Sequence, residues 1–206
     1  MSKEQEINMT SVQMLGLELP TDPRWVNLAE KELEKVLTDH AFCEQKAATY
    51  CISLIQRYPD KEELVKELAP IVTEEWGHFR QVLREMEKRG IKLGRQRKDE
   101  YVNGLKAFAR KGLGRDEKLL DELLTCALIE ARSCERFRLL SLYLKEEKLR
   151  EFYHQFMVSE AGHYHLFLEL ARRYFPREKV DARWKEFLEY EAGLMKKMAL
   201  RGDRVH

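Results

Sequence analysis

Two Glu-x-x-His motifs occur in the sequence, and each follows an isolated glutamate by about thirty residues. The six residues concerned are Glu44, Glu75, His78, Glu130, Glu160 and His163. Carboxylate oxygens and imidazole nitrogens together are ligands for iron and manganese. One such motif arises easily by chance, but two copies at matching distances behind a glutamate indicate a site that binds two metal ions.

The hydrophobic pattern around these residues predicts that they lie in a helical core. Each of four long segments carries a seam of apolar residues at alternating spacings of three and four, as in packed helical bundles. The seams are Leu37, Ala41, Glu44, Ala48, Cys51, Ile55; Leu64, Leu68, Ile71, Glu75, His78, Val82, Met86; Leu120, Leu123, Ala127, Glu130, Cys134, Phe137; and Leu149, Tyr153, Phe156, Glu160, His163, Phe167, Leu170. Each seam is interrupted near its middle, and only by the six residues named above.

The four glutamates are also predicted to lie at one level. Glu44 and Glu75 stand 15 and 16 residues from Pro59, and Glu130 and Glu160 each stand 15 residues from the second turn. At a rise of about 1.5 Å per residue, all four lie roughly 22–24 Å from the hairpin turns. Buried unpaired charges cost several kcal/mol each, and two divalent cations would neutralise four carboxylates. This predicts a di-iron or di-manganese carboxylate site with open coordination positions; protonated acids and hydrogen-bonded histidines in an ordinary core are the alternative.

Glu135 competes with Glu130 for the third ligand position. We prefer Glu130 because its 30-residue distance to the second motif matches the 31 residues between the equivalent glutamates of the first. Arg132 or Arg136 would then pair with Glu135 behind the ligands.

Other residues beside the motifs have weaker signals. His40 and His165 could support the ligands or be ordinary half-buried histidines, and Trp76 and Tyr164 adjoin ligands but could simply pack. Cys126 and Cys134 are predicted to be small packing residues, although a tuning role for Cys134 at the metal stays open. Glu74 lies off the seam and is predicted to face solvent.

Five helices account for the whole pattern, with no alternation typical of β-strands. They are predicted from Asp22–Pro23 to about Arg57, from a capping box at Asp60 and Glu63 to near Gly90, from Asp116 to about Leu144, from the turn at Lys145–Glu147 to before Pro176, and from roughly Asp181 to Leu200. Pro70 is predicted to kink the second of them. Two tight hairpins joined by a long crossover, about residues 90–115, give the connectivity of a ferritin-like four-helix bundle. We therefore expect an all-α fold, a ferritin-like bundle plus a C-terminal helix, in a single di-iron domain over residues 1–206.

Composition narrows the class of protein. The chain of 206 residues is 44% hydrophobic and 35% charged, which is typical of a globular, helix-rich protein. No run approaches the ~20 apolar residues of a membrane span, and residues 1–8 lack the apolar core of a signal peptide. The four cysteines form no CxxC pair and are predicted to be reduced core residues. We expect a cytoplasmic protein without a membrane partner.

The crossover is strongly basic although the formal net charge of the chain is only +1. Residues 88–115 hold ten basic and two acidic side chains. The residues that could contact RNA phosphates are Lys92, Arg95, Arg97, Lys98, Lys106, Arg110, Lys111 and Arg115. Tyr101 and Phe108 could stack on bases or pack on the bundle. A solvated, charged connection without a ligand is the alternative.

Four segments, DHAFCEQKAA, EEWGHF, IEARSCERF and SEAGHYHLF, resemble the MiaE family of tRNA-(2-methylthio-N6-isopentenyladenosine) hydroxylases, and the resemblance extends from about Met14 to Leu200. It implies an O2-dependent, non-haem di-iron monooxygenase that hydroxylates the isopentenyl side chain of this adenosine, next to the anticodon. The six residues named above match the family's ligands, with Glu75 and either Glu130 or Glu160 among the bridging carboxylates. The implied cofactors are two iron ions, with manganese second, and O2 is the co-substrate. The implied partners are tRNA and an external electron donor of the ferredoxin or reductase type, and no DNA.

Two other classes of function stay open from the sequence. One is a ferritin-like di-metal oxidase, peroxidase or iron-handling protein. The other is a metal-free helical module that binds RNA or acts as an adaptor.

Overall fold

The computed structural model describes residues 15–205, and within them it is entirely helical. The predicted absence of a signal sequence in residues 1–8 lies outside this range. No described helix is long and apolar enough to cross a bilayer. The described chain divides into two compact units, one of residues 27–98 and 201–205, the other of residues 15–26 and 99–200. Each is described by itself below, and the prediction of a single domain over residues 1–206 stays a prediction.

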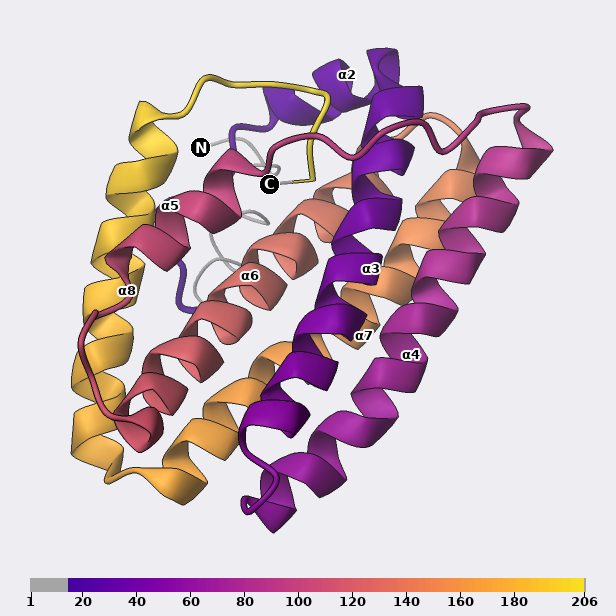
Figure 1. Ribbon diagram of the computed structural model, residues 1–206. Helices are drawn as coiled ribbons and strands as arrows, with labels where there is room; N and C mark the ends of the chain where they lie inside the picture. The colour runs from indigo at the N-terminus through magenta and orange to yellow at the C-terminus, as the bar shows by residue number, and fades with distance from the viewer. Residues whose placement is uncertain (1–14, 206) are drawn as a thin grey trace. The chain divides into compact units, whose positions relative to one another are not determined.

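The first unit, here the α3–α4 unit, is a helical hairpin of α3 (Leu33–Arg57) and α4 (Glu62–Lys88) packed side by side (Figure 1). Tyr58 N–H donates to Leu54 O at the end of α3, and Lys61 N–H donates to Tyr58 O in the turn. At the other end of α4, Gly90 has a φ of +68°, and Ile91 N–H donates to Met86 O. This left-handed glycine cap ends the helix where the sequence predicted it.

The buried faces of α3 and α4 follow the predicted seams. All seven seam residues of α4 are buried, and Pro70 lies within the helix as predicted. Helix α3 buries five of its six predicted seam residues; Leu54 is buried instead of Ile55, and Val36 and His40 are buried as well. The N-cap of α4 is Lys61, one residue later than the predicted capping box at Asp60 and Glu63, and its side chain makes no capping hydrogen bond.

The first helix was predicted as one continuous element, and this prediction is wrong. It is divided into α2 (Arg24–Lys31) and α3, with a break at Glu32. Residues 201–205 of the chain contact this region, since the backbone of Gly202 lies so close to Leu28 that a Cβ atom would stand 2.2 Å from its carbonyl carbon. Val205 N–H donates to Asp39 Oδ2 at 2.8 Å, which attaches the same segment to α3.

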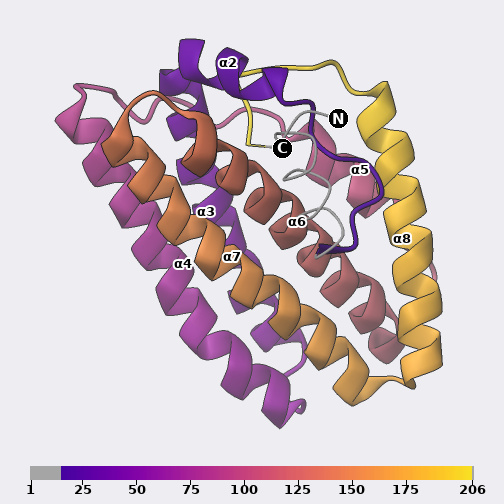
Figure 2. The same cartoon turned by 180° about the vertical axis from the view of Figure 1, so that it is seen from behind.

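The second unit, here the α6–α7 unit, contains a longer hairpin of α6 (Arg115–Tyr143) and α7 (Glu147–Tyr174), joined by the predicted turn. Helix α8 (Arg177–Lys197) packs on α6, and α5 (Glu100–Phe108) packs on α8, as Figure 1 and Figure 2 show. Every predicted seam residue of α6 and α7 is buried. Helix α6 is buried on nearly all sides because it also contacts α5 and α8.

Two expectations about this unit are corrected. The crossover is not a plain connection, because it contains α5, whose N-cap Asp99 accepts a hydrogen bond from Val102 N–H. The last helix begins at Arg177, directly after Pro176, and not at Asp181.

Candidate metal centre

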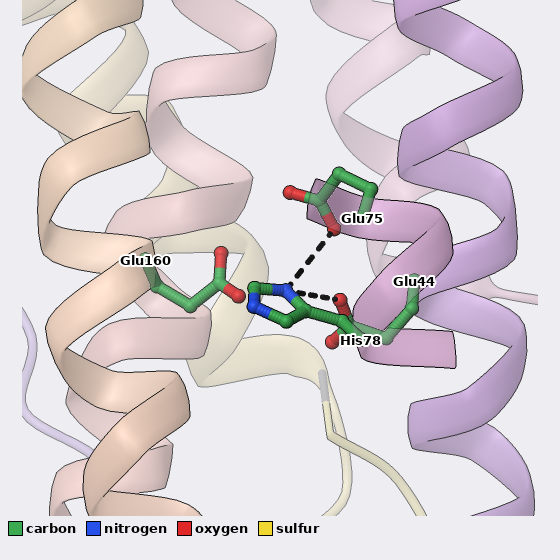
Figure 3. Close-up of side chains that lie close together, drawn as sticks. All are labelled: Glu44, Glu75, His78 and Glu160. Carbon is green, nitrogen blue, oxygen red and sulfur yellow. Dashed lines mark ion pairs between the residues drawn. The ribbon is translucent and has the colours of Figure 1, made fainter. Parts of the chain in front are cut away.

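The hairpin of α3 and α4 brings the first three predicted ligands together. His78 Nδ1 lies 3.3 Å from Glu44 Oε2 and 3.8 Å from Glu75 Oε2 (Figure 3). One ligand atom from each of the three residues can be chosen so that all lie within 4.8 Å of one another, and all three residues are buried. The Glu-x-x-His spacing explains this arrangement, because positions three apart share a helix face.

The hairpin of α6 and α7 does the same for Glu130, Glu160 and His163. Their ligand atoms also lie within 4.8 Å of one another, and His163 Nδ1 stands 3.5 Å from Glu160 Oε2. All three residues are buried. Each unit thus holds two carboxylates and one imidazole, a donor set with two formal negative charges that suits one divalent cation.

Both imidazoles are oriented in the same way. In each, Nδ1 faces the carboxylates, whereas Nε2 faces the residue four positions earlier on its own helix. That residue is Glu74 for His78, at 3.9 Å, and Ser159 for His163, at 3.5 Å from its Oγ. A hydrogen bond to the outer nitrogen orients a ligating imidazole and leaves its other nitrogen for a metal, and Ser159 stands at the limit of that distance. Sequence reasoning missed both partners, although the spacing of four residues on one helix could have indicated them.

His40 is a further buried partner on the α3–α4 unit. Its side chain is fully buried, and Nε2 lies 2.8 Å from Glu44 Oε1. The sequence left open whether His40 supports a ligand, and the structure places it against one. Its neighbour Asp39 accepts the hydrogen bond from Val205, so the end of the chain is attached one residue away from this contact. His165, in contrast, is exposed.

The electrostatics of the α3–α4 unit favour a stored proton when no metal is bound. Burial by itself would lower the pKa of His78, but hydrogen bonds and charge from Glu44 and then Glu75 outweigh burial and raise the pKa to about 10. A protonated imidazole therefore substitutes for a cation between the two carboxylates. A metal ion that binds here must displace this proton.

The α6–α7 unit has a buried acceptor that fits a cation. Glu160 Oε1 is inaccessible to solvent and takes no hydrogen bond from any residue in the range 15–205. A buried carboxylate oxygen without a donor is costly, and a metal ion would satisfy it. Together with the donor types, this oxygen indicates that the residues present fit the predicted metal.

Glu135 is engaged elsewhere. Its carboxylate accepts hydrogen bonds from Thr21 N–H at 2.7 Å and from Arg132 Nη1 at 2.6 Å, which confirms the predicted Arg132–Glu135 pair. Arg132 is fully buried and also pairs with Glu191 on α8 at 2.7 Å. The sequence of α8 could have indicated Glu191, because this residue continues the apolar series Val180, Trp184 and Phe187 at spacings of four, three and four. Glu191 was not among the predicted partners.

Cys134 is a buried thiol beside these residues. Its Sγ donates to Met157 O at 3.4 Å, which attaches α6 to α7. Burial first, and then the charges of Glu160 and Glu135, raise the pKa of the Cys134 thiol to about 12. A thiol of this kind stays protonated and packs, and Cys126 is buried as well.

The basic crossover separates into residues that hold the fold and residues that face solvent. Arg97 pairs with Asp203 at 2.8 Å, and Arg110 pairs with Asp121 at 2.8 Å. The aromatic residues pack instead of standing free for stacking, since Tyr101 is buried against Glu191 and the ring of Phe108 stacks on Tyr190 at 4.2 Å. Arg110 is nevertheless exposed, as are Lys92, Arg95, Lys98, Lys106, Lys111 and Arg115.

With this geometry in view, comparison with known proteins places the chain. The model of the family described as tRNA-(MS[2]IO[6]A)-hydroxylase (MiaE) matches residues 8–206. The chain belongs to the MiaE family. This membership confirms the resemblance of the four sequence segments.

Two curated relatives bear the same name, tRNA 2-(methylsulfanyl)-N(6)-isopentenyladenosine(37) hydroxylase. The one from Pseudomonas putida is 41% identical over 155 residues, which cover 75% of this chain and 74% of that protein. The one from Salmonella typhimurium is 29% identical over 228 aligned positions, covering 87% and 83%.

A solved structure supports the fold. It is that of Protein 43 with aldehyde deformylating oxygenase activity from Synechococcus, and it is 35% identical to this chain, with a TM-score of 0.86 over 92% of this chain and 94% of that one. The likeness confirms the predicted all-α, ferritin-like fold class.

Proposed function

We propose that this protein is an O2-dependent, non-haem di-iron monooxygenase that hydroxylates the isopentenyl side chain of 2-methylthio-N6-isopentenyladenosine in tRNA, next to the anticodon. The observation that carries the proposal is the repeated set of two carboxylates and an imidazole, one on each hairpin, in a chain of the MiaE family. The names of the curated relatives supply the substrate, and the oxygenase activity of the related Synechococcus protein agrees with the type of chemistry.

Six side chains would hold two iron ions, with manganese as the second choice. They are Glu44, Glu75, His78, Glu130, Glu160 and His163. The equal distance of the four glutamates from the turns of their hairpins supports the assignment of all four as ligands. Bound iron would supply the activation of O2, which amino-acid side chains cannot perform.

The chain itself would orient and insulate this chemistry. Ser159 contacts the outer nitrogen of His163 and His40 contacts Glu44, and both contacts would help to orient the ligands before a metal arrives. Glu74 lies 3.9 Å from the outer nitrogen of His78. The imidazole of His78 would give up its stored proton when the metal binds. The apolar seams around the ligands would exclude water from the reacting side chain.

The substrate and the reductant come from outside. An adenosine beside the anticodon lies in a single-stranded loop, so its extrusion toward a buried site costs little unpairing. We propose that an external ferredoxin or reductase supplies electrons. A ferritin-like peroxidase or iron-handling protein is less well supported, because the family model and both curated relatives are named as tRNA hydroxylases.

The test is mass spectrometry of tRNA nucleosides from cells with and without the protein. Cells that contain it should show the prenylated adenosine with one added oxygen atom, and cells without it only the precursor. Complementation with Glu160→Gln should fail, whereas Glu151→Gln, at an exposed position of α7, should restore the product. An identical nucleoside profile in cells with and without the protein would refute the proposal.

A further inference from the structure

The outer face of α4 carries an exposed tryptophan. Trp76 is 47% exposed, whereas the other two tryptophans, Trp25 and Trp184, are buried at 0% and 8% exposure. Its ring leans on Phe79, with 5.0 Å between the centroids, so it is supported from one side and open on the other. A large aromatic surface left in water is a common feature of binding sites.

Two arginines continue from Trp76 along the same face. Arg80 and Arg84 follow at spacings of four residues, about 6 Å along the helix axis for each step. Both are exposed, and neither forms a hydrogen bond or ion pair with another residue in the described part of the chain. They differ in this from Arg97 and Arg89, which pair with Asp203 and Glu85.

Further exposed cations lie beyond the end of the helix, where the chain turns away from α4 and runs past the start of α3 (Figure 1). Lys92, Arg95 and Lys98 are exposed, and none forms an ion pair among residues 15–205. Residues 76–98 contain eight basic and two acidic side chains. Glu85 is occupied by Lys88 and Arg89, so Glu87 is the acid that stands exposed on this face.

We propose that this surface binds the single-stranded part of the RNA substrate, with Trp76 stacking on a base and the cations contacting phosphates. The surface, here the α4 stripe, consists of Trp76, Arg80 and Arg84 on α4, and the crossover beyond the helix adds Lys92, Arg95 and Lys98. This inference rests on the proposed function and extends it from the crossover onto the body of α4.

The chemistry of the stripe favours RNA with unstacked bases over other partners. The guanidinium groups of arginines without protein partners can form paired hydrogen bonds to phosphate oxygens, because their N–H donors are not already used within the protein. A base can stack on Trp76 only if it is free of its neighbours, as in a loop. The stripe begins directly after Glu75, so it lies on the outer side of a helix whose inner side carries two proposed ligands.

The test compares binding of a labelled anticodon stem–loop RNA by the iron-loaded protein and its variants. Arg80→Glu/Arg84→Glu should weaken binding about tenfold or more, and should lower the slope of log affinity against log salt by about 1.4, since each single-strand phosphate contact contributes about 0.7. Trp76→Ala should weaken binding roughly five- to a hundredfold, the range measured for loss of one base stack. Glu87→Gln should tighten it.

The matched control is Lys196→Glu/Lys197→Glu, which makes the same change in net charge at two exposed positions of α8. It should bind as the wild type does. A second readout is fluorescence: RNA should quench tryptophan emission in the wild type but not in Trp76→Phe. Helicity and iron content should be equal in all variants, which separates binding from misfolding.

Two results would overturn the proposal. One is equal RNA affinity of Arg80→Glu/Arg84→Glu and the control. The other is a variant that binds RNA as tightly as the wild type but turns over more slowly, with a normal rate when a small chemical reductant is supplied. The stripe would then bind an acidic electron-donor protein. If the wild type hydroxylates tRNA, either result would refute the binding surface but leave the proposed function intact. A wild type that neither binds nor hydroxylates tRNA would refute both the proposed function and the binding surface.

Discussion

Replacement of Glu191 by glutamine tests the buried charge cluster of the α6–α7 unit. Arg132 is fully buried, with Glu135 Oε2 at 2.6 Å and Glu191 Oε1 at 2.7 Å. The neighbouring guanidinium of Arg136 is buried as well, and burial followed by repulsion from Arg132 lowers its pKa to about 10. Two cations therefore balance two anions in a volume closed to water.

Glu191→Gln keeps the shape of the side chain but leaves two buried cations against one anion. Removing one partner of a buried ion pair costs about 3–5 kcal/mol of unfolding free energy. For a chain of this length, the melting temperature should fall by roughly 6–20 °C. Since total stabilities are about 5–15 kcal/mol, the loss should be plain in urea denaturation.

The matched control is Glu189→Gln on the same helix. Glu189 is 56% exposed and lies 3.8 Å from Lys185, so its loss should change the unfolding free energy by less than about 0.5 kcal/mol. A second control, Arg132→Met/Glu191→Met, removes both charges and should recover part of the stability. A loss below about 1 kcal/mol for Glu191→Gln would refute the claim that the cluster depends on charge balance.

Four further predictions concern His78, Gly202 and Cys134. Iron added to the metal-free protein at neutral pH should release the proton of His78, measurable as heat that changes with the ionisation enthalpy of the buffer; no dependence on the buffer would contradict the raised pKa. Because that pKa is raised from 6.5 to about 10, the stability it gives the metal-free protein is full below about pH 6.5 and is lost as the pH rises through 10, and His78→Gln should remove this dependence in denaturation curves. Gly202→Ala would place a Cβ 2.2 Å from the Leu28 carbonyl carbon, so it should cost about 1–3 kcal/mol and expose residues 201–205 to proteolysis; wild-type resistance would show that the contact is looser than described. Cys134 should resist maleimide in the native protein and react after unfolding, and native labelling would contradict its burial.

The helices that carry the site were predictable because their periodicity is local. Each seam repeats at three and four residues over most of its helix, and Pro59 and Gly90 mark the two ends of α4, so packing and sequence point the same way. The six polar residues could be selected because they alone interrupt otherwise apolar faces. Their placement on the two hairpins follows from these seams, and their role as ligands stays a prediction.

The missed features depend on contacts between distant segments. No glycine or proline stands between Arg24 and Arg57, so periodicity gave no sign of the break at Glu32, where residues 201–205 approach Leu28. Helix α5 has only nine residues, and the basic residues of the surrounding segment drew attention away from its short apolar face.

The buried cluster around Arg132 was found only in part for the same reason. Arg132 contacts Thr21, Glu191 and Glu135, which are 111, 59 and 3 positions away along the chain. Only Glu135 lies on the same helix as Arg132. Charged residues are rarely buried unless paired, so a single sequence offers no direct rule for choosing such partners.

The central claim is that iron held by these six residues adds an oxygen atom from O2 to a prenylated adenosine in tRNA. The most direct measurement is mass spectrometry of the nucleosides after the iron-loaded, reduced protein has reacted with tRNA under isotopically heavy O2. We expect the hydroxylated nucleoside to carry one heavy oxygen atom in the wild type, and no product with Glu160→Gln. A product whose oxygen comes from water, or a tRNA left unchanged by the iron-loaded protein, would contradict the account.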